Sequence, residues 1–344
     1  MKYFTGSYIV TIAGIICAYL WGEHVHNGTG LLCVFIALIL GILEVSLSFD
    51  NAVVNAMKLE KMDKIWEQRF LTWGIAIAVF GMRFLFPLLV VGIFAKLNIL
   101  KVLNIALTDS NQYAHYLHQT HAPIVAFGGS FLLMLFLAYF FNCNKEIHWI
   151  KGLEPLCCKL GNIKGFETII TLIAVLITHH FVSLEYKSAV LTSGIIGVIT
   201  YLTIDGITHW LEKHENERAK HLSETAKHGG LIAFLYLELI DASFSLDGVL
   251  GAFALSQDIV IITIGLSIGA MFVRSLTVML VEQKTLAKYI YLEHGAHWAI
   301  GALAIIMFIS TTVEVPEVVT GLLGLGFILT AFFSSILENK KEQG

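Results

Sequence analysis

Two short segments rich in acidic and hydroxyl residues interrupt long apolar stretches of this sequence. The first runs from Glu44 to Asn51 as EVSLSFDN, and the second runs from Asp241 to Gly248 as DASFSLDG. Both place an acid, two serines and an aspartate at the same spacing. Carboxylate, hydroxyl and amide oxygens are the ligands that Mg²⁺, Ca²⁺ and Mn²⁺ prefer. The candidate ligands are Glu44, Ser48, Asp50, Asn51, Glu238, Asp241, Ser245 and Asp247.

Five acids are costly where they stand in the apolar stretches: Glu44, Asp50, Glu238, Asp241 and Asp247. An ionised carboxylate at the centre of a membrane helix costs about 2.5–3.5 kcal/mol. Five of them together, unpaired, would exceed the usual stability of a whole domain. They must therefore be protonated, paired or bound to a cation. Arg83 and Arg274 are the candidate charge partners or gate residues, but two arginines cannot neutralise five acids.

The composition indicates that lipid is the solvent. Of 344 residues, 56% are hydrophobic and only 14% are charged, whereas a soluble domain carries about 25% charged residues. The sequence has no basic tail or basic-aromatic surface, so nucleic acid is not an expected partner. We expect all five cysteines to be ordinary thiols, because their spacing fits no zinc site.

Apolar stretches long enough to cross a bilayer divide the chain into about ten transmembrane helices. The expected spans are 6–22, 30–56, 69–94, 123–142, 166–185, 187–204, 229–255, 258–281, 297–313 and 316–337. With ten spans, nearly all lysines and arginines of the connecting segments fall on the side of the two termini. The other side holds Lys96, Lys101 and Lys187. The positive-inside rule then places both termini in the cytoplasm.

The two halves of the sequence match each other beyond the acidic segments. Gly74 precedes Arg83 by nine residues, as Gly265 precedes Arg274. The acidic helices 30–56 and 229–255 are the second and seventh spans, so they cross the membrane in opposite directions.

This pattern predicts an all-α polytopic fold built as a five-plus-five inverted-topology repeat. The first repeat comprises residues 1–185 and the second comprises residues 186–344. In transporters with such repeats, the substrate site lies near the bilayer midplane at the interface of the repeats. We therefore expect the two acidic segments to form one site.

A regular helix would not direct both acids of one segment at the same ion. Asp50 lies about 120° around the helix from Glu44. A local break in the helix would bring the two together, as in the discontinuous helices of transporters. No histidine or cysteine occurs in either segment, and His179 and His180 are the less favoured sources of a softer ligand.

The segment EVSLSFDN and its partial repeat DASFSLD resemble the TerC-like integral membrane proteins, in the LysE-type transporter group. The resemblance is closest to a longer bacterial branch without an assigned function. It implies an exporter of Mn²⁺ in the bacterial inner membrane, with ligands at Glu44, Asp50, Asp241 and Asp247. The chain departs from a symmetric pattern where Gly248 replaces the asparagine and where Glu238 has no acidic counterpart.

The residues thus favour a secondary transporter that exports a divalent cation in exchange for protons, and the resemblance implies that this cation is Mn²⁺. We expect no enzyme activity and no resident cofactor; the expected partners are the ion, protons and lipid, and a homo-oligomer is compatible with the sequence. Two alternatives stay open. One is a non-transporting scaffold or sensor in a stress complex, docked through the lysine-rich segments 58–69 and 205–228. The less favoured one is an intramembrane aspartyl protease using Asp50 and Asp247.

Overall fold

The fold comes from a computed structural model of the whole chain. The structure describes residues 2–25, 28–60, 62, 64–143, 145, 147–219, 234–235, 237–239, 241, 249, 252, 255–256, 258–284, 288–313 and 315–342.

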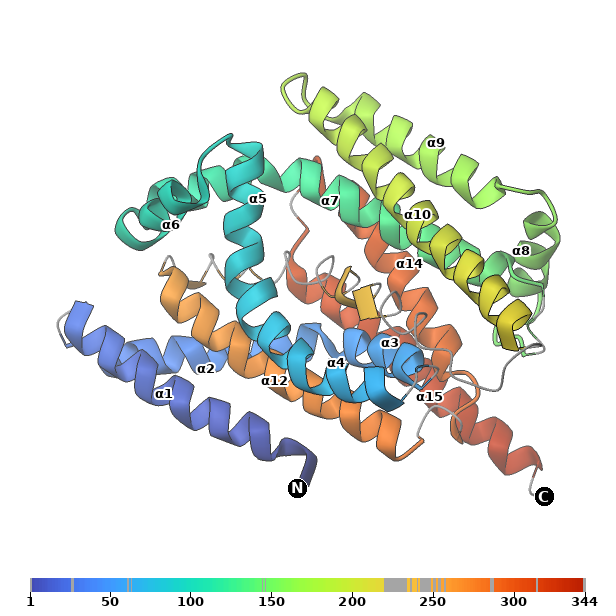
Figure 1. Cartoon of the computed structure of the whole chain (residues 1–344), viewed down its shortest axis with the longest axis horizontal. Helices are drawn as coiled ribbons and strands as arrows, with labels where there is room; N and C mark the ends of the chain where they lie inside the picture. Colours follow the sequence, from blue (N-terminus) through green and yellow to red (C-terminus); the bar gives the residue numbers. More distant parts are fainter. Residues whose placement is uncertain are drawn as a thin grey trace.

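The described chain is helical, as its apolar composition predicts (Figure 1). After a short 3₁₀ turn, η1 (Lys2–Phe4), the helices are α1 (Thr5–Val25), α2 (Gly30–Leu47), α3 (Phe49–Leu59), α4 (Lys64–Ala76), the π-helical η2 (Ile77–Leu85), α5 (Phe86–Phe94), α6 (Ile99–Thr108), α7 (Ser110–Phe141), α8 (Leu153–Gly161), α9 (Phe166–Phe181), α10 (Lys187–Ala219), α12 (Ile259–Glu282), α14 (Leu292–Ser310) and α15 (Glu317–Glu342).

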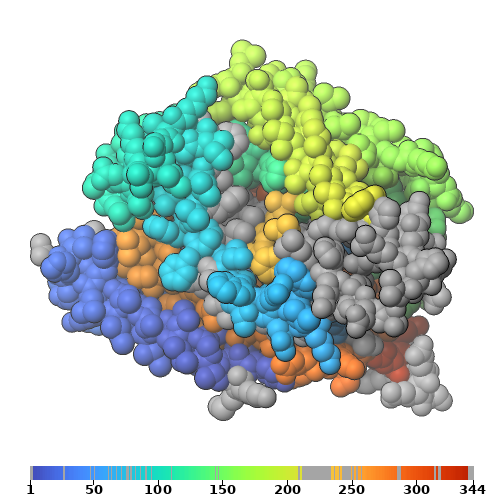
Figure 2. All heavy atoms as spheres, viewed as in Figure 1, coloured from blue at the N-terminus to red at the C-terminus, as the bar shows by residue number. Residues whose placement is uncertain are grey.

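The helices make this chain a multi-pass membrane protein. Among the described residues, six helices are long and apolar enough to cross a bilayer, or up to eight if each of two bent pairs counts as one span. The large apolar side chains of α1 face outward, including Ile9, Ile12 and Ile16, and α1 forms the lower left surface in Figure 2. Such exposed apolar surface is stable only against lipid.

Several expected spans differ from the observed helices. α7 begins at Ser110 rather than at residue 123, because Asp109 accepts a hydrogen bond from the Gln112 N–H (3.0 Å) and caps an earlier, polar first turn. α6 and α8 are additional helices. The expected span 229–255 lies largely outside the described residues. The count of ten spans and the cytoplasmic termini stay predictions.

The acidic segment of the first half lies at a break between α2 and α3. Residues Gly30–Ser46 and Asn51–Leu59 form two helical pieces bent by 56°. The Ser46 hydroxyl donates back to the Ile42 carbonyl (2.8 Å), a bond that tends to bend helices. Ser48 leaves the helical conformation with φ −102° and ψ 20°. The sequence suggested that such a break would be needed to bring the acids together.

α12 packs along α2 through small residues. A Cβ atom at Gly265 would lie 2.6 Å from Leu40 Cβ, and one at Gly269 would lie 2.4 Å from Glu44 Cβ. Close packing of this kind, through small residues one turn apart, is typical of membrane helices. It fixes α12 directly against the helix that carries Glu44.

The remaining helices pack mainly through α7. α7 makes extensive contacts with α10 and α14, and α14 packs against α15. In Figure 1, α9 and α10 lie in the upper part, α1, α2 and α12 lie in the lower part, and α5 runs between the two. The largest buried cluster joins α3, α7 and α14 through residues such as Met57, Phe131 and Ile300.

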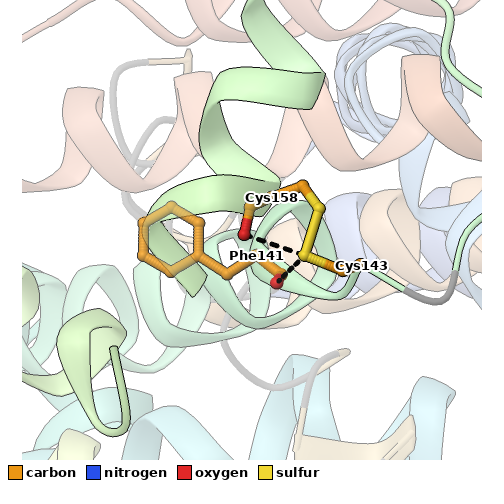
Figure 3. Close-up of a disulfide and its surroundings, with 3 residues drawn as sticks. All are labelled: Phe141, Cys143 and Cys158. Carbon is orange, nitrogen blue, oxygen red and sulfur yellow. Dashed lines mark hydrogen bonds between the residues drawn. A yellow bond between two sulfur atoms is a disulfide. The ribbon is translucent and has the colours of Figure 1, made fainter. Parts of the chain in front are cut away.

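The expectation that all five cysteines are ordinary thiols is wrong for two of them. Cys143 and Cys158 form a disulfide, with Cα atoms 4.9 Å apart (Figure 3). The bond joins the end of α7 to α8 across a loop, and spacing alone does not indicate that closure. Cys17, Cys33 and Cys157 are free.

Candidate functional site

Glu44 lies near the end of α2, just before the break, and its side chain is buried (3% exposed). The Ser48 hydroxyl donates a hydrogen bond to Glu44 Oε1 (3.0 Å). Arg83 Nη2 donates to the same oxygen and forms an ion pair with it. The carboxylate is thus held by a hydroxyl from its own helix and by a guanidinium from η2.

Arg83 connects the two halves of the sequence. Its Nη1 lies 3.9 Å from Asp241 Oδ2, and the Asn51 amide donates to Asp241 Oδ1 at 2.6 Å. Arg83 is only 2% exposed, and it lies on a π-helical segment, a distortion that often marks functional sites. The structure therefore brings Glu44, Asn51, Arg83 and Asp241 into one buried cluster.

Arg274 and Glu238 lie beside this cluster and line the same small cavity. Both side chains are buried, and the Arg274 guanidinium carbon lies 4.7 Å from the centre of the Phe70 ring. Gly74 leaves room for both: a Cβ atom there would lie 2.9 Å from Arg274 Nη1 and 3.2 Å from Glu238 Oε1. Arg274 Nε and Nη2 make no hydrogen bond with any described residue.

A small cavity lies between the two arginines. Its volume is about 20 Å³, which is room for about one water molecule. Its lining consists of Asn55, Phe70, Gly74, Arg83, Glu238, Asp241, Ala270, Val273, Arg274 and Thr277.

Asn55 and Thr277 also line the cavity, and neither was predicted from the sequence. The Asn55 carbonyl oxygen is buried and makes no hydrogen bond with a described residue, and the Thr277 hydroxyl contacts the Ala52 carbonyl at 3.3 Å. One signal was available: Asn55 lies one helical turn after Asn51, on the same face of α3. Thr277 carries no such signal, because its position at the cavity depends on the packing of α12 against α3.

Some candidate residues lie outside this description. Ser245 and Asp247 fall outside the described residues, and Asp50 is described for its backbone only. His179 lies at the turn between α9 and α10, with Nδ1 3.0 Å from the Lys187 carbonyl oxygen. His180, beside it, is exposed.

The described cluster has more negative than positive charge. Glu44, Glu238 and Asp241 face Arg83 and Arg274, which leaves one carboxylate in excess. Among the described residues, no group of three or more His, Cys, Asp or Glu side chains could hold a metal ion. Arg83 forms an ion pair with Glu44 and lies 3.9 Å from the Asp241 carboxylate.

Comparison with known proteins places the sequence in a different group from the one its motif suggested. A family model described as "Protein of unknown function (DUF475)" matches residues 49–342. No curated protein and no solved structure matches the chain. The resemblance to TerC-like proteins of the LysE group is therefore wrong. A motif of eight residues, made of acids and serines between apolar residues, is too short to distinguish such families.

Proposed function

We propose that this chain, which belongs to the DUF475 family of proteins of unknown function, is a secondary transporter that exports a divalent cation in exchange for protons. It acts as a transporter and not as an enzyme, and the ion is its substrate. The observation that carries the proposal is the buried cluster of Glu44, Asn51 and Asp241 beside a helix break.

Burial of these acids is hard to explain by stability alone. Carboxylates within membrane helices are costly and commonly mark the path of an ion or proton. A broken helix at the same place is a recurrent feature of transporter sites. The oxygen donors of Glu44, Asn51 and Asp241 suit a hard or borderline divalent cation.

The arginines give the site a means of exchange. Arg83 contacts Glu44 and Asp241, so a cation that binds both carboxylates must displace its guanidinium. We propose that Arg83 and Arg274 hold the carboxylates between transport events and release them when the cation binds. Competition of this kind prevents unpaired negative charge in the low-dielectric core.

The inverted repeat is part of the proposal. The sequence match pairs Gly74 and Arg83 of the first half with Gly265 and Arg274 of the second half. Both arginines line one cavity. An interface between two repeats would explain why equivalent residues from both halves meet there. We also propose that the protein lies in the bacterial inner membrane.

Because the resemblance to TerC-like proteins is wrong, the identity of the transported ion is open. Oxygen donors alone suit Mn²⁺, Mg²⁺ and Ca²⁺, and we propose Mn²⁺ as the ion to test first. Liposomes that contain the purified chain should accumulate Mn²⁺ when a pH gradient drives the exchange. The rate of accumulation should saturate with Mn²⁺ concentration, and Mg²⁺, Ca²⁺, Zn²⁺ and Fe²⁺ serve as competitors.

Three variants test the site in that assay. Glu44→Gln, Asp50→Asn and Asp247→Asn should each reduce Mn²⁺ accumulation at least tenfold, because each removes a negative oxygen ligand. Asp109→Asn is the matched control: it removes an exposed acid at the start of α7, where asparagine caps a helix equally well. Normal transport by all three site variants would show that the site is assigned wrongly.

A further inference from the structure

A second group of buried titratable residues lies where the end of α7, α8 and the start of α14 meet. Its centre is Glu154, which is 1% exposed. The Glu154 carboxylate accepts hydrogen bonds from the Trp149 backbone N–H (3.0 Å) and from Trp298 Nε1 (3.3 Å). His294 is 3% exposed, and its Nδ1 lies 3.0 Å from Glu154 Oε2. None of these residues lines the cavity at Arg83 and Arg274.

Other titratable groups surround the pair on every element near it. They are Tyr139 on α7, Lys145 in the following loop, Cys157 on α8, and Glu293 and His297 on α14.

Lys145, in the loop after α7, is close enough to Glu154 to interact with it electrostatically. Its ammonium nitrogen lies 3.8 Å from the centre of the Tyr139 ring. Burial lowers the pKa of the Lys145 ammonium to about 8, while Glu154 and Glu293 oppose that shift. The disulfide Cys143–Cys158 closes the loop that carries Lys145 and Trp149.

The pair can hold or release one proton at small electrostatic cost. A protonated imidazole next to Glu154 gives a neutral pair, which is the form that a buried site favours. When the proton leaves, the carboxylate keeps the two N–H donors of Trp149 and Trp298. The Glu154 carboxylate is therefore hydrogen-bonded whether or not His294 carries the proton.

We propose that Glu154 and His294 form a site that binds and releases the proton exchanged for the cation. This step rests on the transport function proposed above. α14 provides the physical connection, because it carries His294 at its start and packs against α3, the helix that carries Asn51. Protonation of the pair changes the charge at the start of α14 and so changes how α14 packs against α3.

The test compares two assays on the whole chain in liposomes. One measures exchange of labelled for unlabelled Mn²⁺ at equal pH on both sides, and the other measures Mn²⁺ accumulation driven by a pH gradient. Glu154→Gln and His294→Gln should leave the exchange within twofold of the wild-type rate. Both should reduce accumulation driven by the gradient at least tenfold, since the cation then moves without its proton.

His297→Gln is the control that separates proton binding from packing, because it removes a histidine one turn along the same helix. It should keep gradient-driven accumulation. Gradient-driven accumulation that survives in Glu154→Gln would overturn the proposal. Loss of the Mn²⁺ exchange itself in Glu154→Gln, while His297→Gln still exchanges Mn²⁺, would also overturn it, because the acid would then serve cation movement directly.

An infrared pH titration of the purified protein tests the proton site without any transport assay. A pH-dependent imidazole band should be present in the wild-type protein and absent in His294→Gln, and Glu154→Gln should shift the pH at which that band changes. If wild-type protein moved no cation in either assay, the proposed transport function would fail, and this titration alone would decide the proton site. Absence of any titrating band assigned to the pair would overturn it.

Discussion

Arg83 is the residue on which the charge balance of the described core depends. It contacts Glu44 and Asp241, which come from different halves of the sequence. Removing one partner of a buried ion pair leaves an uncompensated charge, which costs about 3–5 kcal/mol. Replacing both partners of such a pair costs far less. This asymmetry makes the role of Arg83 measurable.

We expect Arg83→Gln to lower the free energy of unfolding by about 3 kcal/mol or more. The double variant Arg83→Gln with Glu44→Gln should recover part of that loss, because the unpaired carboxylate is then neutral. Chemical unfolding of the protein in detergent measures both. Arg69→Gln is the control, since Arg69 is exposed and rests on the Trp66 ring. Equal stability of Arg83→Gln and Arg69→Gln would contradict the ion pair.

At the scale of elements, the packing of α12 on α2 decides where Glu44 lies. Gly265 and Gly269 allow the two helices to approach so closely that any side chain would meet Leu40 or Glu44. Gly269 lies directly against Glu44. The position of the acid therefore depends on a residue that has no chemistry of its own.

Gly269→Ala should displace α2 at Glu44 and reduce Mn²⁺ accumulation, because the added Cβ would lie 2.4 Å from Glu44 Cβ and 2.7 Å from the Gly41 carbonyl. Overpacking of this kind costs about 1–3 kcal/mol. The matched control is Gly206→Ala on α10, where a Cβ meets nothing within 4 Å. Transport rates and unfolding temperatures compare the two. Identical behaviour of both variants would argue against close packing of α2 on α12.

At the scale of the whole molecule, the positive charges determine how the chain lies in the membrane. If the prediction of ten spans is correct, the lysine-rich segments between spans and both termini face the cytoplasm. The Glu154–His294 pair then lies near the cytoplasmic surface, and so does the Cys143–Cys158 disulfide, a bond that is rare in the reducing cytosol. That is the side on which an exporter would release its protons.

Reporter fusions test this orientation. A fluorescent protein joined after Gly344 should fluoresce in cells, and alkaline phosphatase joined there should be inactive, because neither is exported. A fusion inserted at Lys96 should give the opposite pair of results. An active phosphatase at the C-terminus would contradict the predicted orientation.

The sequence by itself determined the class of the protein and the residues worth examining. Its apolar stretches indicated a multi-pass membrane protein, and the structure confirms this. Acids are so rare in such stretches that Glu44 and Asp241 could be selected by type alone. The same local reading gave a wrong family, because a short motif does not distinguish families.

Only the tertiary structure decided which groups meet. Arg83 lies 39 residues from Glu44 and Asn51 lies 190 residues from Asp241, and no local pattern specifies a contact at such separations. No sequence signal marks Thr277 or the pair of Glu154 and His294, and the bond between Cys143 and Cys158 depends on how a loop closes. Helix formation follows from nearby residues, whereas ion pairs, cavities and disulfides follow from how helices far apart in sequence pack against one another.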